Sequence, residues 1–538
     1  MLPVSGKTKT ETPRKNLSRG VDMRRREFVE QMGGAALLAR ATSVPRTTFG
    51  QAVAQDVGTL AVPGKPTREF FYRPAGAWAA DFIPFFRDGT FHLFYLLDWR
   101  DRHKHGEGTP WYQISTRDFV HFTEHGEMLA RGALSDQDLY VFTGSVIEGQ
   151  GRFHIFYTGH NPYLRRRGQP EQTVMHAVSD DLLKWKKIPE DTFFAPQATY
   201  EPHDWRDPFV FWNEEAREYW MLLAARLKTG PSRRRGCTAL CASRDLKMWE
   251  VRDPFWSPGL YFTHECPDLF HMGDWWYLVY STFTERTVTH YRMSRSLKGP
   301  WLAPENDTFD NRAFYAAKTA SDGKRRFAFG WNPTRVECRD YQPYHWGGNL
   351  VVHEVVQETD GSLSVKVPET VDEVFARKAP FKFRPALGKS EITSDVIQIA
   401  APDSFGCAVG GSTPDPCKIE ATLDFSDGTR GCGIMLRASE DLEEAYYVRL
   451  EPGRQRLVLD SWPRPGDVPF MVELERPIRL TPKNPVELKI FLDGSVCEVY
   501  ADSKVAMSAR LYNRYSGDWG LFVNEGAAHF RNIKLMTL

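Results

Sequence analysis

The sequence predicts an all-β protein, in which a five-bladed β-propeller is followed by a C-terminal β-sandwich. Three observations lead to this prediction. Aromatic strand patterns recur from about residue 70, and runs of alternating polar and apolar residues replace them after about residue 368. No long 3.6-residue periodicity occurs past the first 55 residues. Long repeats built of strands are typical of propellers, and short alternating strands are typical of sandwiches.

The charge balance and the cysteine content exclude several classes of protein. The 538 residues include 69 Lys and Arg and 69 Asp and Glu, so the formal net charge is zero. This argues against nucleic acid or an anionic membrane as a partner, because both attract a basic face. No apolar run approaches the roughly 18 to 20 residues that span a bilayer. The 8 Cys residues lack a CxxC pair and give no sign of a disulfide scaffold or a zinc site.

The first 55 residues differ from the rest of the chain. Residues 1–26 hold eight Lys or Arg and two acids, and an apolar stretch from Gly33 to Ala39 follows. An Ala-x-Ala sequence ends at Ala54, and this order of features is typical of a secretory signal. The pair Arg25 and Arg26 indicates the twin-arginine type. We therefore expect a leader at residues 1–55 and export to the periplasm or the cell exterior. A disordered basic tail is the alternative.

Residues 56–368 are predicted to form the propeller. An aromatic strand pattern occurs five times at intervals of about 50 to 65 residues, each time after a turn rich in Gly, Asp or Asn. One hairpin with its flanking strands in each interval corresponds to one blade. The five patterns are Phe91–Tyr95, Phe153–Tyr157, Tyr219–Leu223, Trp276–Tyr280 and Arg326–Gly330.

Residues 369–538 are predicted to form the sandwich. Polar and apolar residues alternate in Lys418–Phe425, Tyr446–Glu451 and Leu488–Leu492, and Gly-containing turns separate these runs. Strands of this kind at this spacing favour an antiparallel sandwich.

Three acids occupy corresponding places ahead of predicted hairpins. Asp81 precedes the first hairpin, Asp207 the third and Glu265 the fourth. The inner strands of a propeller converge on one axis, so these side chains are expected to meet there. Hydrolysis of a glycosidic bond needs a pair of carboxyl groups, one to attack or to activate water and one to donate a proton. A third carboxylate can hold ring hydroxyls, and taken singly each acid could also be a turn or cap residue.

With their neighbours, these acids resemble the three signature blocks of glycoside hydrolase family 32, the invertase and fructanase family. The resemblance covers the chain from about residue 70 to the end, and it implies a five-bladed propeller with a following sandwich. Further segments resemble other motifs of the family, namely Trp111–Phe122, Phe142–Ser145, Trp346–Glu354 and Leu488–Glu498.

Carried over by position, the resemblance implies a role for each site residue. Asp81 would be the nucleophile, Glu265 the general acid/base and Asp207 the stabiliser of the transition state. The sugar would be bound by the side chains of Trp78, Phe142, Arg206 and Trp331. The family retains anomeric configuration, which needs carboxyl groups about 5 to 5.5 Å apart. The resemblance implies no cofactor and no metal, and a carbohydrate as the partner.

One block departs from the family pattern. The family reads W-M-N-D-P-N-G, whereas this chain has Trp78, Ala79, Ala80, Asp81, Phe82, Ile83 and Pro84. Because all three acids remain while their surroundings change, we expect an active enzyme on an unusual substrate. The main reading is a β-fructosidase-type hydrolase acting on sucrose, fructan or another furanoside. Fructosyltransferase or arabinofuranosidase- or xylosidase-like action is the second reading, and a non-catalytic sugar-binding propeller is the third.

Three other groups of residues are candidates for functional sites. Cys237 and Cys241 are expected to be a buried pair on one face of a strand. Arg233–Arg235 are expected to form a solvated loop, with contact to an anionic substrate as the alternative. A polar cluster after the first hairpin either lines the mouth of the site or forms an ordinary loop; its members are Asp98, Asp101, His103 and His105.

Overall fold

The computed structural model describes residues 66–538, apart from residues 69, 464–473 and 483. In this part of the chain the α-helices are no longer than five residues: α2 (Arg102–His105), α3 (Pro162–Arg165) and α4 (Glu369–Glu373). The predicted all-β class is therefore confirmed. The predicted leader, residues 1–55, lies outside the described residues. In the described part of the chain, no helix is both long and apolar enough to cross a membrane.

Antiparallel strands follow one another in five groups up to residue 366. Each predicted aromatic pattern lies in the second strand of its group. The groups are β2 (Trp78–Arg87), β3 (Thr90–Asp98), β4 (Trp111–Thr116) and β5 (His121–Leu129), with β1 (Pro66–Arg68) beside β5; β6 (Tyr140–Gly149), β7 (Arg152–His160), β8 (Gln172–Ser179) and β9 (Lys186–Lys187); β10 (Tyr200–Asn213), β11 (Glu218–Leu227), β12 (Gly236–Ser243) and β13 (Glu250–Val251); β14 (Glu265–Met272), β15 (Trp275–Thr282) and β16 (Val288–Ser294); and β17 (Tyr315–Ser321), β18 (Arg326–Arg335), β19 (Tyr344–Gln357) and β20 (Leu363–Lys366).

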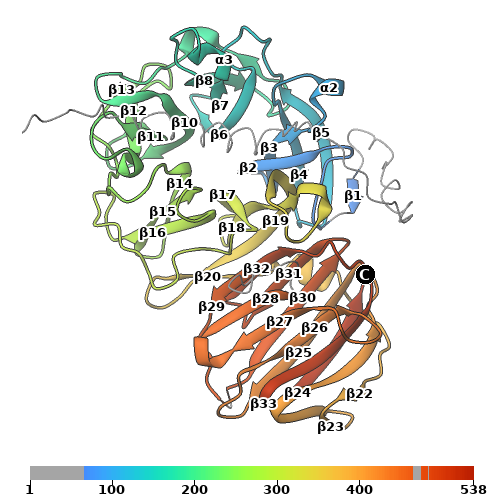
Figure 1. Ribbon diagram of the computed structural model, residues 1–538. Coiled ribbons are helices and arrows are strands. Elements are labelled where there is room, and N and C mark those ends of the chain that lie inside the picture. Colours follow the sequence, from blue (N-terminus) through green and yellow to red (C-terminus); the bar gives the residue numbers. More distant parts are fainter. Residues whose placement is uncertain (1–65, 69, 464–473, 483) are drawn as a thin grey trace, which may run out of the picture. The chain divides into compact units, whose positions relative to one another are not determined.

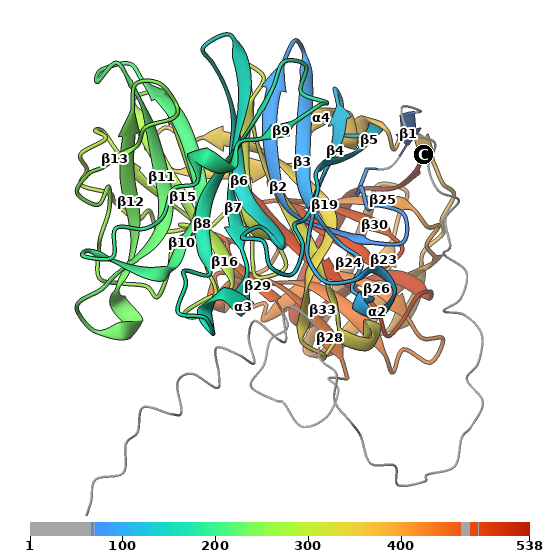
Figure 2. The same cartoon turned by 90° about the horizontal axis from the view of Figure 1, so that it is seen from above.

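The first strands of the five groups contact one another in cyclic order. β2 contacts β6, β6 contacts β10, β10 contacts β14, β14 contacts β17, and β17 contacts β2 again. Figure 1 shows the groups around a common centre in chain order, from blue through green to yellow. Seen from above, the β6–β7 pair lies between the β2–β3 and β10–β11 pairs (Figure 2). The fifth group also joins the first in one sheet, because β19 pairs with β2 at Gly348 and Ala79.

The same turn follows the third strand in three of the groups. An Asp side chain accepts hydrogen bonds from backbone N–H groups of the next residues, which is the usual way that Asp fixes a tight turn. The residue after the Asp then takes a positive φ of 60° to 65°. The three Asp residues, each followed by its positive-φ neighbour, are Asp118 and Phe119, Asp181 and Leu182, and Asp245 and Leu246.

After β20 the strands belong to a separate, 13-stranded antiparallel sheet. It is called the second sheet below, because it follows the five groups in the chain. Its 20-residue strand β33 pairs with β24, β25 and β26, so one strand joins several parts of the sheet. The predicted alternating runs lie in β25, β27 and β30. The strands are β21 (Arg377–Lys378), β22 (Arg384–Leu387), β23 (Lys389–Ile392), β24 (Val396–Ser412), β25 (Cys417–Phe425), β26 (Gly431–Ala438), β27 (Ala445–Glu451), β28 (Arg456–Trp462), β29 (Leu474–Pro477), β30 (Val486–Asp493), β31 (Val496–Ala501), β32 (Val505–Arg510) and β33 (Asp518–Thr537).

Buried polar side chains connect the fifth group to this second sheet. Asn332 of β18 donates through Nδ2 to Glu498 Oε1 at 3.0 Å and to the carbonyl oxygen of Ala509 at 2.9 Å. Arg510 of β32 donates back to the carbonyl oxygen of Asn332 at 2.8 Å. Asn332 and Glu498 are fully buried, and buried polar groups are stable only when they are paired.

Asp310, in the segment before β17, is the centre of these contacts. Its carboxylate accepts from Ser508 Oγ at 2.8 Å, from the Ser508 backbone N–H and from His353 Nε2 at 3.0 Å. Burial opposes the charge of Asp310, but His353 and the other donors outweigh burial and hold the pKa of this carboxyl below its ordinary value. The buried carboxylate therefore depends on partners from both parts of the protein.

We expect Asp310→Asn to lower the free energy of unfolding by about 3 to 5 kcal/mol, because it breaks a buried charged network. The measurement is the shift of the urea unfolding midpoint, with the slope of the transition as a check on its extent.

Glu525→Gln is the matched control. Glu525 pairs with Arg430, and their side chains are 49% and 74% exposed. An exposed ion pair contributes at most about 1 kcal/mol. The prediction fails if Asp310→Asn shifts the midpoint no further than Glu525→Gln does.

Candidate active site

The first strand of every group is interrupted near its beginning. The regular pairing skips a residue after Ala80, Phe142, Arg206, Glu265 and Tyr315. Positive φ angles follow at Asp81 (46°), Asp207 (58°), Cys266 (50°) and Ala316 (51°). Such bulges turn side chains out of the ladder and are frequent next to active sites. They place the predicted acids at the centre of the five groups.

The three acids do not occupy one equivalent position, which corrects the sequence prediction. Asp81 and Asp207 are themselves the residues with positive φ, whereas Glu265 comes one residue before Cys266, which has it. Glu265 therefore corresponds to Arg206 and Tyr315 of the neighbouring groups. The difference is one residue at a bulge, where the strand no longer alternates regularly between faces.

Asp81 is held by donors from two other groups. Thr143 Oγ1 donates to Asp81 Oδ2 at 2.6 Å, and Trp331 Nε1 donates to Asp81 Oδ1 at 3.0 Å. Both oxygens therefore accept hydrogen bonds, which favours the ionised form. Trp331 is buried and pairs with Tyr315 across β17 and β18, with the ring centroids 5.7 Å apart.

Glu265 and Asp207 are joined to the same cluster. Tyr315 donates its hydroxyl to Glu265 Oε2 at 2.7 Å, so Trp331 and Tyr315 connect Asp81 to Glu265. The backbone N–H of Cys266, next to Glu265, donates to Asp207 Oδ2 at 2.9 Å. The three predicted acids are thus brought together.

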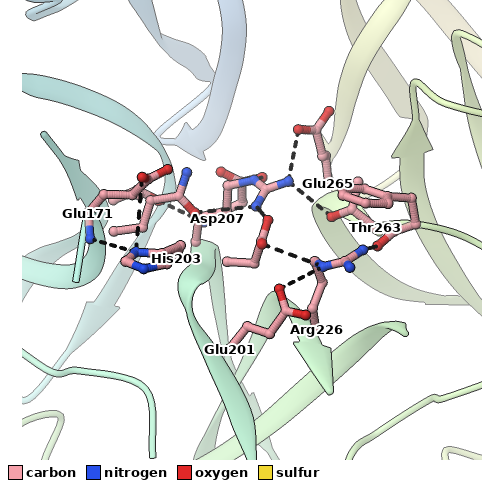
Figure 3. Close-up of polar contacts among 12 residues, drawn as sticks. Glu171, Glu201, His203, Asp207, Arg226, Thr263 and Glu265 are labelled. Atoms are coloured by element: carbon pink, nitrogen blue, oxygen red, sulfur yellow. Dashed lines mark hydrogen bonds and ion pairs between the residues drawn. The ribbon is translucent and has the colours of Figure 1, made fainter. Parts of the chain in front are cut away.

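Arg206 lies among the acids, and its donors are used inside the protein. Nη2 donates to Glu265 Oε1 at 3.0 Å and to Thr263 Oγ1 at 3.0 Å. Nη1 donates to Asp204 Oδ1 at 2.8 Å, and Nε lies 3.7 Å from Asp207 Oδ2. Figure 3 shows Asp207, Thr263 and Glu265 in this network. The predicted bond from Arg206 to a sugar stays a prediction, and the structure adds a role in orienting Glu265.

Burial is the largest influence on the pKa values of all three acids. It raises the pKa of Asp81 to about 7, with repulsion from Asp207 and Glu265 adding to the rise and the bonds from Thr143 and Trp331 opposing it. Burial also raises the pKa of Glu265, and Asp207 adds to the rise while Arg206 opposes it. The pKa of Asp207 is raised by burial as well, against the charge of Arg206. A carboxyl group whose pKa is about 7, as that of Asp81 is, can exchange protons near neutral pH.

Comparison with known families settles the class of the protein. The model for the N-terminal domain of glycosyl hydrolases family 32 matches residues 72–366, and the C-terminal model of that family matches residues 388–537. The chain belongs to this family. It is a β-fructofuranosidase-like glycoside hydrolase, as the resemblance predicted.

Relatives within family 32 resemble the chain over most of its length. A levanbiose-producing levanase of Bacillus subtilis (strain 168) is 25% identical over 487 residues, which are 84% of this chain and 86% of the relative. A raffinose invertase of Escherichia coli is 25% identical over 430 residues, 75% of this chain and 80% of the relative. The crystal structure of an exo-inulinase from Aspergillus awamori has a TM-score of 0.65 at 20% identity, and the match covers 88% of this chain and 98% of that one. That likeness shows the fold alone.

The predicted aromatic sugar contacts differ in their surroundings. Trp331 bonds to Asp81 directly. Phe142 is half-buried and stacks on His160 at 4.6 Å, and the ring of Trp346 lies 6.5 Å from it. Trp78 is also half-buried, and the guanidinium carbons of Arg73 and Arg100 lie 4.9 Å and 4.6 Å from the centre of its ring.

Thr143 and Tyr315 are site residues that the sequence analysis missed. Each occupies the bulge of its own first strand, in the second and fifth groups. Aligning the five groups by these strands, rather than by the aromatic hairpins, would have placed Thr143 beside Asp81 and Tyr315 beside Glu265. The signal is weak because neither residue type identifies the chemistry by itself.

The three other candidate groups of residues lie in ordinary structural elements. Cys237 and Cys241 are buried in β12, as predicted. Arg233 and Arg234 are exposed in a short turn, also as predicted, whereas Arg235 is half-buried and pairs with Glu201. The cluster after the first hairpin is divided. Asp98 accepts from the backbone N–H of Arg100, Asp101 caps α2, and His105 stacks on Trp99, while His103 is exposed in α2.

Asp310, His353 and Glu498 are the described residues that could hold a metal ion, with ligand atoms within 4.8 Å of one another. Each of these side chains already has partners in the protein, among them Ser508, Tyr500 and Asn332. These three residues lie where the fifth group of strands meets the second sheet, and their partners differ from those of Asp81 and Glu265.

Removing the Thr143 hydroxyl tests the environment of Asp81. Thr143→Val removes a hydrogen bond that favours the anion, so the pKa of Asp81 rises from about 7. The role predicted for Asp81, that of the nucleophile, requires an ionised carboxylate, so we expect the acidic limb of kcat/KM to move to higher pH by about 1 to 2 units. The measurement is a pH profile of kcat/KM.

Thr143→Ser is the control, because it keeps the hydroxyl and should leave the limb in place. Equal shifts in both variants, or no shift in Thr143→Val, would show that this hydrogen bond does not govern the ionisation of Asp81.

Proposed function

We propose that this chain is an exported, retaining glycoside hydrolase that cleaves fructosyl or related furanosyl linkages by double displacement. The observation that carries the proposal is the joining of Asp81, Asp207 and Glu265 into one hydrogen-bonded cluster at the bulges of three first strands. Two carboxyl groups that differ in surroundings are what glycosidic hydrolysis requires.

In the proposed first step, an oxygen of Asp81 attacks the anomeric carbon while the bond to the leaving oxygen breaks. Glu265 gives its proton to that oxygen. In the second step, water gives a proton to Glu265 and displaces Asp81 from the sugar, so the configuration is retained. Asp81 suits attack because both of its oxygens only accept hydrogen bonds. We expect the Asp81 and Glu265 carboxyls to lie roughly 5 to 6 Å apart when substrate is bound.

The remaining groups of the site would bind the sugar and stabilise developing charge. Asp207 is fixed by the N–H of Cys266 and lies beside Arg206, so it is preorganised near the reacting centre. We propose that Asp207 accepts bonds from ring hydroxyls and that Trp78, Phe142 and Trp331 form the apolar wall. Arg206 would contribute to sugar binding while it orients Glu265.

We propose a five-bladed propeller at residues 56–368 and a sandwich at residues 369–538 as the architecture. The cyclic contacts of β2, β6, β10, β14 and β17 support five blades. The change of sheet between β20, which ends at Lys366, and β21, which begins at Arg377, supports the boundary.

The proposed substrate class is sucrose, a fructan or another furanoside. The relatives named levanase and raffinose invertase support a fructosyl linkage. Ala80 stands where the family pattern has Asn, and it is fully buried, so this chain has no polar side chain at that position next to Asp81. A screen of sucrose, inulin, levan and arabinan by reducing-sugar release and chromatography tests this class. Release of arabinose alone would favour the arabinofuranosidase-like reading instead.

Export is proposed on the composition of residues 1–55. Fractionation of cells that express the full chain should place the protein outside the cytoplasm, and replacing Arg25 and Arg26 by Lys should retain it inside. Equal distribution of the two forms would contradict the twin-arginine route.

The two catalytic roles can be separated by substitution. Glu265→Gln removes the proton donor but leaves the nucleophile, so a furanoside with a good leaving group should still form the covalent intermediate. Azide should then restore turnover, because it attacks without a general base. Asp81→Asn should be inactive on every substrate. We expect losses on the order of 10² to 10⁴ for Glu265→Gln on natural substrates, measured as kcat/KM.

Two outcomes would contradict the assigned roles of Asp81 and Glu265. Identical behaviour of the two variants across leaving groups, with no response to azide, would mean that the assigned roles are wrong. Full activity of Asp81→Asn would remove the double-displacement mechanism altogether.

A further inference from the structure

Glu265 is the first member of a line of alternating charges that runs away from the site. Each member contacts the next, and the line ends near β12. The contacts are Glu265 Oε1 to Arg206 Nη2 (3.0 Å), Arg206 Nη1 to Asp204 Oδ1 (2.8 Å), Asp204 Oδ2 to Arg226 Nε (3.5 Å), Arg226 Nε to Glu201 Oε2 (3.1 Å) and Glu201 Oε1 to Arg235 Nη2 (3.0 Å). Glu201, Arg226 and Glu265 are labelled in Figure 3.

The middle of this line is almost fully buried, and its ends are partly exposed. The side chains of Asp204 and Arg226 are 2% exposed, whereas those of Glu265 and Glu201 are 22% and 20% exposed. Charges that lie away from water are poorly screened, so a change at one member is felt by the next.

Arg226 is fixed on several sides. Nη1 donates to the carbonyl oxygen of Phe262 at 2.7 Å, and Nη2 donates to that of Ser232 at 2.8 Å. The guanidinium carbon also lies 3.6 Å from the centre of the Phe262 ring. Arg226 therefore offers Asp204 a positive charge at a fixed place.

Asp204 and Glu265 share one guanidinium. Arg206 directs Nη1 to Asp204 and Nη2 to Glu265, and the planar group cannot turn toward one acid without leaving the other. Stronger pairing with Asp204 thus weakens the pairing with Glu265. The reverse holds as well.

We propose that Asp204 and Arg226 are positioning residues that divide the Arg206 guanidinium between Asp204 and Glu265, and thereby set the pH at which the proton donor loses its proton. The inference rests on the role proposed for Glu265. It extends the active site to two side chains of β10 and β11 that do not touch Glu265.

The sign of each effect follows from the groups that face Glu265. These are Arg206 and Asp207 from β10, Tyr315 from β17 and Asp81 from β2, with Lys318 of β17 acting on Asp207. Arg206 is the positive group in contact with Glu265. Removing the charge of Asp204 leaves more of Arg206 for Glu265, which stabilises the carboxylate and lowers the pKa of Glu265. Removing the charge of Arg226 has the opposite effect.

The test is the basic limb of the kcat/KM profile, which reports the loss of the donor's proton in the free enzyme. We expect Asp204→Asn to move this limb to lower pH by about 0.5 to 1 unit, and Arg226→Gln to move it to higher pH by about 0.3 to 0.5 unit. The double variant removes one charge of each sign and should return the limb toward that of the wild type. The acidic limb, which reports Asp81, should move less than the basic limb.

Two further variants keep the test decisive if the buried variants fold poorly. Arg226→Lys keeps the charge and should leave the limb in place even where the melting temperature falls. Glu201→Gln lies at the partly exposed end, and it should move the limb in the same direction as Asp204→Asn by about 0.2 unit. Shifts of one sign for acids and arginines alike, or unmoved limbs in both Asp204→Asn and Glu201→Gln, would overturn the proposal.

A second readout separates this proposal from the proposed function. The carboxyl ¹³C resonance of Glu265, assigned by its loss in Glu265→Gln, titrates without any substrate. If the wild-type protein cleaves no furanoside but the variants shift the Glu265 resonance in alternating directions, the proposed function is wrong and the proposal on Asp204 and Arg226 stands. If the protein cleaves a furanoside but neither the pH profile nor the resonance shifts in alternating directions, the proposed function stands and the proposal on Asp204 and Arg226 is wrong.

Discussion

The guanidinium of Arg206 lies among Asp204, Asp207 and Glu265, and the acids of the site depend on it to stay buried close together. Burial raises the pKa of each site acid, and repulsion from neighbouring acids adds to the rise for Asp81 and Glu265. The charge of Arg206 opposes this for Glu265 and Asp207. Its own pKa shows the balance, since burial lowers it but Glu265, Asp204 and Asp207 outweigh burial and raise it. Asp81, which has no ion pair with Arg206, relies on Thr143 and Trp331 instead.

The bulges decide which side chains reach this cluster. A regular strand would point neighbouring residues to opposite faces, but the extra residue and the positive φ release Asp81 and Asp207 from that alternation. The backbone N–H groups exposed by the bulges are satisfied by side chains, as when Asp207 N–H donates to Thr158 Oγ1 at 2.7 Å. The strain of the backbone and the burial of charge thus occur at the same residues, which is where functional sites commonly store both.

The second sheet supports the site through the fifth group. Trp331 bonds to Asp81, and the next residue, Asn332, is held by Glu498 and by the backbone of β32. A change in the second sheet can therefore reach Asp81 through one strand, β18, although the sheet gives no side chain to the cluster of acids. The contact between Asn332 and the second sheet and the position of Trp331 at Asp81 are therefore linked, because the two residues are neighbours in β18.

The sequence by itself determined the all-β class, the five aromatic hairpins and the family, because strand periodicity and short motifs are local properties. It also identified Asp81, Asp207 and Glu265, because carboxyl groups before hairpins are visible in a repeat. Only the tertiary structure showed that Glu265 is offset by one residue from the other two acids, since a bulge changes register without changing composition. The partners Thr143 and Tyr315, and the use of Arg206 inside the protein, were likewise decided by contacts between groups 50 or more residues apart. Hydrogen bonds over such separations depend on how the strands close around a common centre, and no local pattern encodes that.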